Sequence, residues 1–332
     1  MMNSQTELQD QRFKYLYLSS RLGTMRAAAE ELELAVSSIS RQIAKLESDL
    51  GIQLIQEGTH RICLTAAGQA AVDYYVERMG HHNQLLKKLG QLKEGYLNRT
   101  SIAVGEGLLS TQAIGELYQF FKANRQSHTE LLIAPSHEVE RMVAEDEADI
   151  GLVFSPTKTA NINRLHSFDQ PMRAIVHPDH PLAGRSILSL QDLADEDIVL
   201  PPPEYRIRGI IDQLRSESSA HFQPYITSNS LKIMLDLTRN GIASTILSDF
   251  PVIDELCNGT LKAIPIDYHA LNVTQVQIIS RQSRKLSPLS RDLVHYLAMA
   301  INAQIRRIRD CNSRNPNKIF LVRKNAIATA VD

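Results

Sequence analysis

Apolar residues recur at helical spacing within the first 65 residues, in two short stripes with a break between them. The stripes consist of Ala28, Ala29 and Leu32, followed by Ile39, Ile43 and Leu46. The break falls at residues 34–36. Spacing of three and four residues is typical of amphipathic helices, so the pattern predicts two short helices joined by a tight turn, a helix-turn-helix. The second helix of such a motif is sized for the major groove of DNA.

A longer helix is predicted for residues 66–94. A seam recurs in it every three or four residues, at Val72, Val76, Met79, Asn83, Leu86 and Leu89. Such a seam is typical of a helix that pairs with another helix. We therefore expect a linker helix that supports a homodimer or homotetramer. The alternative is a helix that packs only on its own domain.

Beyond residue 95 the pattern changes to short apolar strands that alternate with amphipathic helices. Strands are predicted at residues 100–105, 130–134 and 150–154, with helices at 110–124 and 137–146. This βαβαβ order indicates an α/β fold with a largely parallel sheet. The second half continues in the same style, returns to strands between residues 261 and 280, and closes with a helix predicted for residues 287–305.

A series of short motifs accompanies the two N-terminal stripes at fixed spacing. The series reads Ala28-Ala29, Ile39-Ser40-Arg41-Gln42-Ile43, Leu46-Glu47, Leu50-Gly51, Leu54-Ile55 and Leu64-Thr65-Ala66-Ala67-Gly68. It resembles the DNA-binding domain of LysR-type transcriptional regulators. More weakly, Asp149-Ile150-Gly151, His180-Pro181-Leu182-Ala183 and Asn240-Gly241-Ile242-Ala243 resemble the regulatory domain of the same family.

The resemblance implies a chain of three parts and a tail. These are a winged helix-turn-helix domain at 8–65, a linker or dimerisation helix at 66–94, an effector-binding domain at 95–305, and a basic tail at 306–332 that we expect to be disordered. The effector-binding domain would be built like a periplasmic binding protein, with lobe I at 95–164 and 268–305 and lobe II at 165–267. The implied function is sequence-specific transcriptional regulation of double-stranded DNA, controlled by a small molecule bound between the lobes.

The exposed face of the second helix, with the wing, supplies the candidate DNA contacts. They are Arg26, Val36, Ser37, Ser38, Ser40, Arg41, Lys45, His60 and Arg61. Residues 1–65 hold seven basic and eight acidic residues, so their net charge does not argue for DNA. The chain departs from the family pattern at Ala35-Val36, which lacks a capping side chain, and at Glu57, which should repel phosphate. We therefore expect an unusual operator or weak binding by the protein alone.

Candidate effector contacts follow from the predicted strand order. In open α/β sheets, ligands bind beyond the carboxyl ends of the strands, where helix N-termini favour anions. This rule selects Glu106, Gly107, Ser110, Pro135, Ser136, His137, Leu200, Pro201, Pro202, Pro203, Thr227, Ser228, Asn229, Ser230 and Thr245. Ser110 and Ser230 have helix capping as an alternative role. Arg206 and Arg208 could neutralise a carboxylate, whereas Glu106 would favour an amine or hydroxyl.

Composition limits the other classes of function. The chain has 332 residues, of which 43% are hydrophobic and 22% charged, and no apolar run long enough to span a membrane. We therefore expect a cytoplasmic protein without a membrane partner. Cys63, Cys257 and Cys311 offer neither a disulfide framework nor metal-ligand spacing.

Known catalytic motifs are missing from the sequence. Without a G-x-S-x-G elbow or a P-loop, we expect no enzyme activity, no catalytic residues, no cofactor and no metal. The competing hypothesis is a solute-binding or enzymatic α/β module whose N-terminal helices serve only for assembly.

Overall fold

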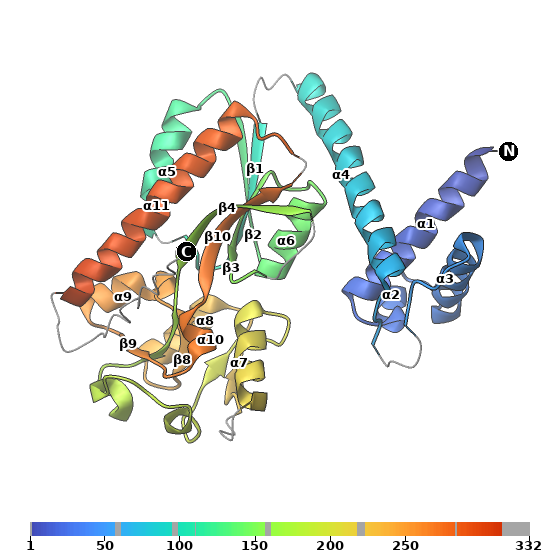
Figure 1. Cartoon of the computed structure of the whole chain (residues 1–332). Helices are drawn as coiled ribbons and strands as arrows, with labels where there is room; N and C mark the ends of the chain where they lie inside the picture. The colour runs from blue at the N-terminus through green and yellow to red at the C-terminus, as the bar shows by residue number, and fades with distance from the viewer. Residues whose placement is uncertain are drawn as a thin grey trace, which may run out of the picture. The chain divides into compact units, whose positions relative to one another are not determined.

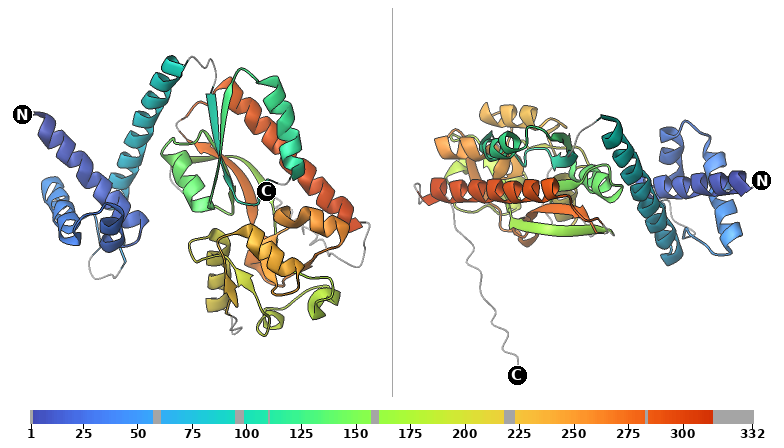
Figure 2. Two further views of the ribbon diagram at one scale, coloured as in Figure 1. Left: turned by 180° about the vertical axis from the view of Figure 1, so that it is seen from behind. Right: turned by 90° about the horizontal axis from the view of Figure 1, so that it is seen from above.

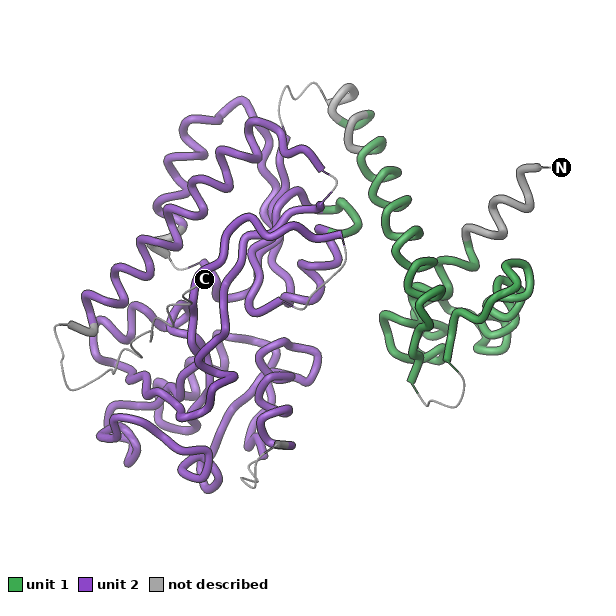
Figure 3. The backbone as a smooth tube through the Cα atoms, viewed as in Figure 1, with its two compact units in different colours: residues 1–94, 144–147 green, residues 95–143, 148–332 purple. Residues whose placement is uncertain are grey.

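The computed structural model describes residues 2–56, 61–94, 99–109, 111–156, 161–217, 223–282 and 284–313. They form two compact units, coloured separately in Figure 3. Unit 1 holds Met1–Glu94 with Ala144–Glu147, and unit 2 holds Gly95–Val143 with Ala148–Asp332.

Unit 1 is a helical head that continues into a long helix (Figure 1). Its helices are α1 (Met2–Arg21), α2 (Met25–Glu31), α3 (Val36–Leu50) and α4 (Ala66–Glu94). The predicted helix-turn-helix is confirmed as α2 and α3, and both apolar stripes face the core, where Ala28, Ile39, Ile43 and Leu46 are at most 1% exposed. Helix α1 was not predicted, and it packs on α2, α3 and α4.

The wing begins as a short antiparallel pairing. Ile55 pairs with Leu64, and the N–H of Gln56 donates to the carbonyl of Cys63. The Glu47 carboxylate in α3 accepts from the N–H groups of Leu54 and Ile55, at 2.8 and 3.1 Å. These bonds attach the start of the wing to α3. Residues 57–60 lie outside the described residues.

The two halves of α4 have different surroundings. In the first half, Val72, Tyr75 and Val76 are buried in the head. In the second half, Leu85, Leu86 and Leu89 are each more than half exposed. The predicted seam therefore packs on its own domain at one end and is open at the other.

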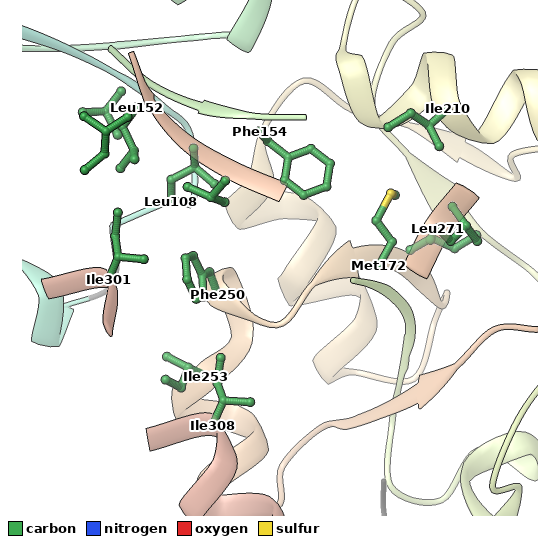
Figure 4. Packing of buried hydrophobic residues seen from close by; sticks show 14 of the residues in the cluster. Leu108, Leu152, Phe154, Met172, Ile210, Phe250, Ile253, Leu271, Ile301 and Ile308 are labelled. Atoms are coloured by element: carbon green, nitrogen blue, oxygen red, sulfur yellow. The ribbon is translucent and has the colours of Figure 1, made fainter. Parts of the chain in front are cut away.

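Unit 2 contains two lobes. The sheet of lobe I has the order β2 (His128–Ala134), β1 (Arg99–Gly105), β3 (Ile150–Phe154), β10 (Gln275–Arg281) and β4 (Ile162–Asp169). Lobe II has the sheet β8 (Thr245–Ser248), β5 (Met172–Val176) and β9 (Lys262–Pro265), and the pair β6 (Val199–Leu200) and β7 (Ile226–Thr227). One hydrophobic core, containing Phe154 of lobe I and Met172 of lobe II, runs through both (Figure 4).

The three predicted strands of lobe I are confirmed, but the prediction of a largely parallel sheet is wrong. Strands β2, β1 and β3 are parallel, since helical crossovers join them. Strand β10 is antiparallel to β3 and β4, because it enters lobe I from lobe II and not through a crossover helix. Strand β5 is antiparallel to both of its neighbours.

Helices flank these sheets. They are α5 (Thr111–Ala123), α6 (Ser136–Ala144), α7 (Arg206–Glu217), α8 (Leu231–Arg239), α9 (Ile253–Asn258), α10 (His269–Asn272) and α11 (Pro288–Ser313), with 3-10 turns η1 (Pro181–Gly184), η2 (Gln191–Leu193) and η3 (Phe250–Val252). Figure 2 shows α5 and α11 side by side, and the rings of Phe120 and Tyr296 meet between them.

The closing helix differs from the prediction. It continues to Ser313, so residues 306–313 are helical and not part of a disordered tail. Ile305 and Ile308 extend its apolar face into the hydrophobic core, which explains the extra turns. Residues 314–332 lie outside the described residues.

The expectation of no disulfide is also wrong. Cys257 in α9 and Cys311 in the last turns of α11 form a disulfide, with their Cα atoms 5.1 Å apart. The two residues are 54 positions apart in the sequence, and only the unpredicted extension of α11 brings them together. Cys63 is a free thiol.

Candidate functional site

Helix α3 has a buried apolar face and an exposed, largely polar face. Val36, Ser37, Ser40, Arg41 and Lys45 are exposed, and Ser38 is partly exposed. The Nε of Arg41 donates to the carbonyl oxygen of Ser37 at 3.1 Å, which holds the guanidinium along the first turns. Ala35 provides no side-chain cap. The open N–H groups at this end of the helix suit phosphate oxygens.

Helix α1 holds α3 through a buried arginine. Arg12 is 5% exposed; its Nε donates to Gln42 Oε1 at 3.1 Å, and its Nη1 lies 2.5 Å from Asp49 Oδ2. This positioning residue is not evident from the sequence, because nothing in the order of residues shows that α1 lies against α3.

The remaining DNA candidates surround α3. Arg26 on α2 is exposed and forms an ion pair with Glu30 at 3.1 Å. Arg61 is exposed at the end of the wing. His60 and Glu57 lie outside the described residues, so the departures in the wing stay predictions.

A pocket lies between the two lobes of unit 2. Its lining residues are Gly105, Glu106, Leu108, Pro135, Ser136, Phe154, Pro201, Tyr205, Arg206, Ile207, Ser228, Asn229, Leu231, Met234, Leu247, Ser248 and Pro251. They come from the ends of β1, β2, β3, β6, β7 and β8 and from the helices that follow. The pocket therefore lies where the strand-end rule expects ligands.

The pocket brings together part of the predicted effector set. Lining residues in that set are Glu106, Pro135, Ser136, Pro201, Ser228 and Asn229. Gly107, His137, Pro202, Pro203 and Thr227 are near in sequence but are not among the lining residues. Ser110 lies outside the described residues.

Three predicted residues have structural roles instead. Leu200 is fully buried. Ser230 caps α8, since its Oγ accepts from the N–H of Ile233. Thr245 is fully buried and donates to the carbonyl oxygen of Val199 at 2.9 Å.

Arg206 is the cation in the pocket wall. Its Nε donates across the lobe junction to the carbonyl oxygen of Ser155 at 2.7 Å, and a guanidinium carries four further N–H donors. Arg208, the other arginine considered from sequence, is bound to Asp212 at 2.9 Å and to the carbonyl oxygen of Pro201 at 3.1 Å. Only the orientation of α7 distinguishes these two arginines.

Tyr205 and Glu106 both line the pocket, and the charge of Glu106 acts on Tyr205. The Tyr205 hydroxyl donates to the carbonyl oxygen of Asn229 at 3.3 Å. Burial raises the pKa of Tyr205, and the charges of Glu106 and Glu204 raise it further. The tyrosine therefore stays a neutral donor beside the Glu106 carboxylate. Leu108, Phe154 and Met234 make much of the remaining wall apolar.

Both units match family models. Residues 11–69 match the bacterial regulatory helix-turn-helix protein model of the lysR family, and residues 94–301 match the LysR substrate binding domain. The second match alone covers more than half of the chain. The chain belongs to the LysR family.

LysR-family relatives extend over nearly the whole chain. The HTH-type transcriptional activator CmpR of Synechocystis is 24% identical over 86% of this chain and 93% of its own length. The transcriptional dual regulator GltC of Bacillus subtilis is 28% identical over 79% and 87%. These relatives are transcriptional regulators, as this LysR-family chain is.

A solved LysR-type regulatory domain has the same fold as unit 2. The Synechocystis CcmR regulatory domain, in complex with 2-PG, is 18% identical with a TM-score of 0.55, over 61% of this chain and 97% of its own. In the part of the LysR-family chain that the structure describes, every helix is too short or too polar to cross a membrane.

Proposed function

We propose that this LysR-family regulator reads double-stranded DNA with the exposed face of α3 and responds to a small organic acid held between its lobes. It acts in the cytoplasm as a homo-oligomer and not as an enzyme. The observation that carries the proposal is the pairing of an exposed polar face on a firmly held α3 with an arginine-bearing pocket in the second unit.

The DNA part of the proposal assigns base and phosphate contacts by side-chain chemistry. Arg41 can bond guanine through two donors, and the hydroxyls of Ser38 and Ser40 suit either bases or phosphate. Val36, which is 44% exposed, offers an apolar contact for a thymine methyl. A gel-shift titration of the purified chain on DNA flanking its own gene tests this part. A salt-sensitive complex with a defined fragment is expected, and equal binding to unrelated DNA would contradict it.

The effector part assigns a carboxylate to Arg206. A guanidinium pairs with a carboxylate through two parallel hydrogen bonds. Ser136, Ser228 and Asn229 line the same pocket and can bond hydroxyls of the ligand. Glu106 would repel a second negative charge and favours an amine or hydroxyl at that end. The CcmR regulatory domain, which is solved with a small molecule, is consistent with this use of the fold.

Arg206→Met is expected to weaken binding of the effector. A library of small organic acids and amino acids is screened by thermal shift on the full chain, since a ligand of the folded state raises Tm by mass action. Compounds that stabilise the wild type should bind Arg206→Met at least about tenfold more weakly, because a charged hydrogen bond of roughly 1.5–3 kcal/mol is lost.

Arg215→Met is the matched control, because Arg215 lies on the same helix, pairs with Asp212 and does not line the pocket. It should keep the stabilisation by the same compounds. Equal responses of the two variants would contradict the assignment of Arg206.

We also propose that the exposed leucines of the second half of α4 pair with a second copy of the chain. Leu85, Leu86 and Leu89 supply the apolar surface. Effector binding would favour one lobe arrangement, and the paired helices would pass that preference to the spacing of the two heads.

A further inference from the structure

The disulfide joins the two lobes. Cys257 lies in α9, between strands β8 and β9 of the lobe II sheet. Cys311 lies near the end of α11, whose body packs on α5 and β1 of lobe I. The LysR substrate binding domain match ends at residue 301. Cys311 therefore belongs to an extension beyond the part of the chain that this family model describes.

Two further contacts accompany the sulfur bridge. Ile308 of α11 and Ile253 of α9 lie side by side in Figure 4 and share one hydrophobic core. The Nη1 of Arg307 lies 2.6 Å from Asp254 Oδ1. Since the apolar contact and the ion pair do not require the bridge, they keep the two helices together when both cysteines are thiols. The two cysteines therefore stay close enough to form the disulfide again after it has been reduced.

Both helices also lead to the pocket. Ser248 and Pro251 line it, at the end of β8 and in the turn η3 that leads into α9. From the other side, the Nε2 of Gln304 in α11 donates to the carbonyl oxygen of Leu108 at 3.4 Å, and Leu108 lines the pocket. A bond between α9 and α11 therefore restricts how far two pocket walls can move apart.

We propose that Cys257 and Cys311 form a redox switch that sets the mobility of the effector pocket. Both cysteines are partly exposed, so a small oxidant can reach them. With oxidised glutathione as the oxidant, one cysteine thiolate attacks a glutathione sulfur and releases one glutathione thiolate. The second cysteine thiolate attacks the mixed disulfide and releases the other. The two cysteines are oxidised, the glutathione disulfide is reduced, and the two thiol protons pass to the released thiolates.

Oxidation has a defined consequence for the pocket. In the disulfide form, the segments at 106–109 and 248–251 open less often, because a covalent bond between α9 and α11 restricts their separation. In the dithiol form the same segments depend on the Ile253–Ile308 contact and the Arg307–Asp254 pair. The link to gene regulation rests on the proposed function of the pocket, whereas the change in local opening does not.

The test uses the full chain with Cys63→Ser, so that only the two bridging cysteines remain. The protein is equilibrated with defined ratios of reduced to oxidised glutathione. Mass spectrometry of peptides then measures the fraction that joins Cys257 to Cys311. Hydrogen exchange is compared between the fully oxidised and fully reduced samples. We expect complete, reversible closure, and exchange at 106–109 and 248–251 several-fold slower in the oxidised form.

Three variants complete the experiment. Cys257→Ser and Cys311→Ser should show the same exchange at both glutathione ratios. Asp254→Asn removes only the ion pair and should keep the redox response. A bridge that does not form, a bridge that the reduced glutathione cannot reopen, or equal pocket exchange in both forms would each overturn the proposal.

The proposed function is tested separately by DNA binding of the reduced protein. Redox-dependent exchange without DNA binding would reject the proposed function and keep the switch. DNA binding without redox-dependent exchange would do the reverse.

Discussion

Gly68→Ala is expected to destabilise the DNA-binding head by about 3 kcal/mol or more, at the upper end of what overpacking costs. A β-carbon at residue 68 would overlap the carbonyl oxygen of Leu54 and lie 2.9 Å from its carbonyl carbon. That oxygen accepts from the N–H of Thr65 at 2.9 Å, and the Leu54 side chain is 1% exposed. Relief of the overlap therefore moves backbone that attaches both the wing and α4 to the core.

Gly90→Ala is the matched control, since both glycines lie in α4 and nothing lies within 4 Å of a β-carbon at residue 90. It should be neutral, or stabilising by up to about 1 kcal/mol through helix propensity. Urea unfolding followed by circular dichroism, together with DNA affinity, measures both variants. Equal stability of Gly68→Ala and Gly90→Ala would show that the close approach of α4 to Leu54 is not required.

Arg173→Met is expected to destabilise unit 2 by about 3–5 kcal/mol at neutral pH, because it leaves a buried carboxylate without its partner. The Arg173 Nε lies 3.1 Å from both carboxylate oxygens of Asp249. The two side chains are only 11% and 5% exposed. Burial raises the pKa of Asp249, although the Arg173 charge and its hydrogen bond lower it.

The loss of stability in Arg173→Met should increase as the pH rises. With Arg173 gone, the pKa of Asp249 in the folded state rises further, so the folded protein binds the proton more tightly than the unfolded chain. The free energy of unfolding of Arg173→Met is therefore highest below about pH 3.9, the pKa of an aspartate in the unfolded chain. It falls as the pH rises through the pKa of Asp249 in the folded state. Urea unfolding between acidic and neutral pH should show this recovery on acidification.

Asp249→Asn in the Arg173→Met background removes the buried charge and should restore much of the stability at neutral pH. It should also flatten the pH dependence. If the single and double variants have the same stability at neutral pH, the cost does not arise from the unpaired carboxylate.

Sequence alone predicted the elements whose periodicity is strong. The stripe with Ala28 and Ala29 predicted α2, and the stripe with Ile39 and Ile43 predicted α3. The family motifs predicted the helix-turn-helix and the regulatory domain, and family models match both. Helix α1 was missed, because a buried arginine, Arg12, interrupts its apolar pattern.

The pocket residues at the strand ends were predicted from the sequence, whereas those on the helices were missed. The strand-end rule selected Glu106, Ser136 and Ser228, which line the pocket, because strand ends meet wherever parallel strands pair. It could not select Met234 or distinguish Arg206 from Arg208, since these depend on the rotation of α7 and α8 about their axes. The disulfide depended on about two extra turns of α11, and the contact of these turns with α9 cannot be read from the sequence.

Whether α3 reads DNA is tested by the affinity of Arg41→Ala for the DNA flanking its own gene, measured at two or more salt concentrations. Arg185→Ala removes an equal charge from lobe II, where Arg185 is 64% exposed, and serves as the control. We predict that Arg41→Ala binds roughly 10–100-fold more weakly and discriminates less between fragments, while Arg185→Ala binds as the wild type does. Equal affinity of Arg41→Ala and the wild type would contradict the assignment of α3 as the helix that reads DNA.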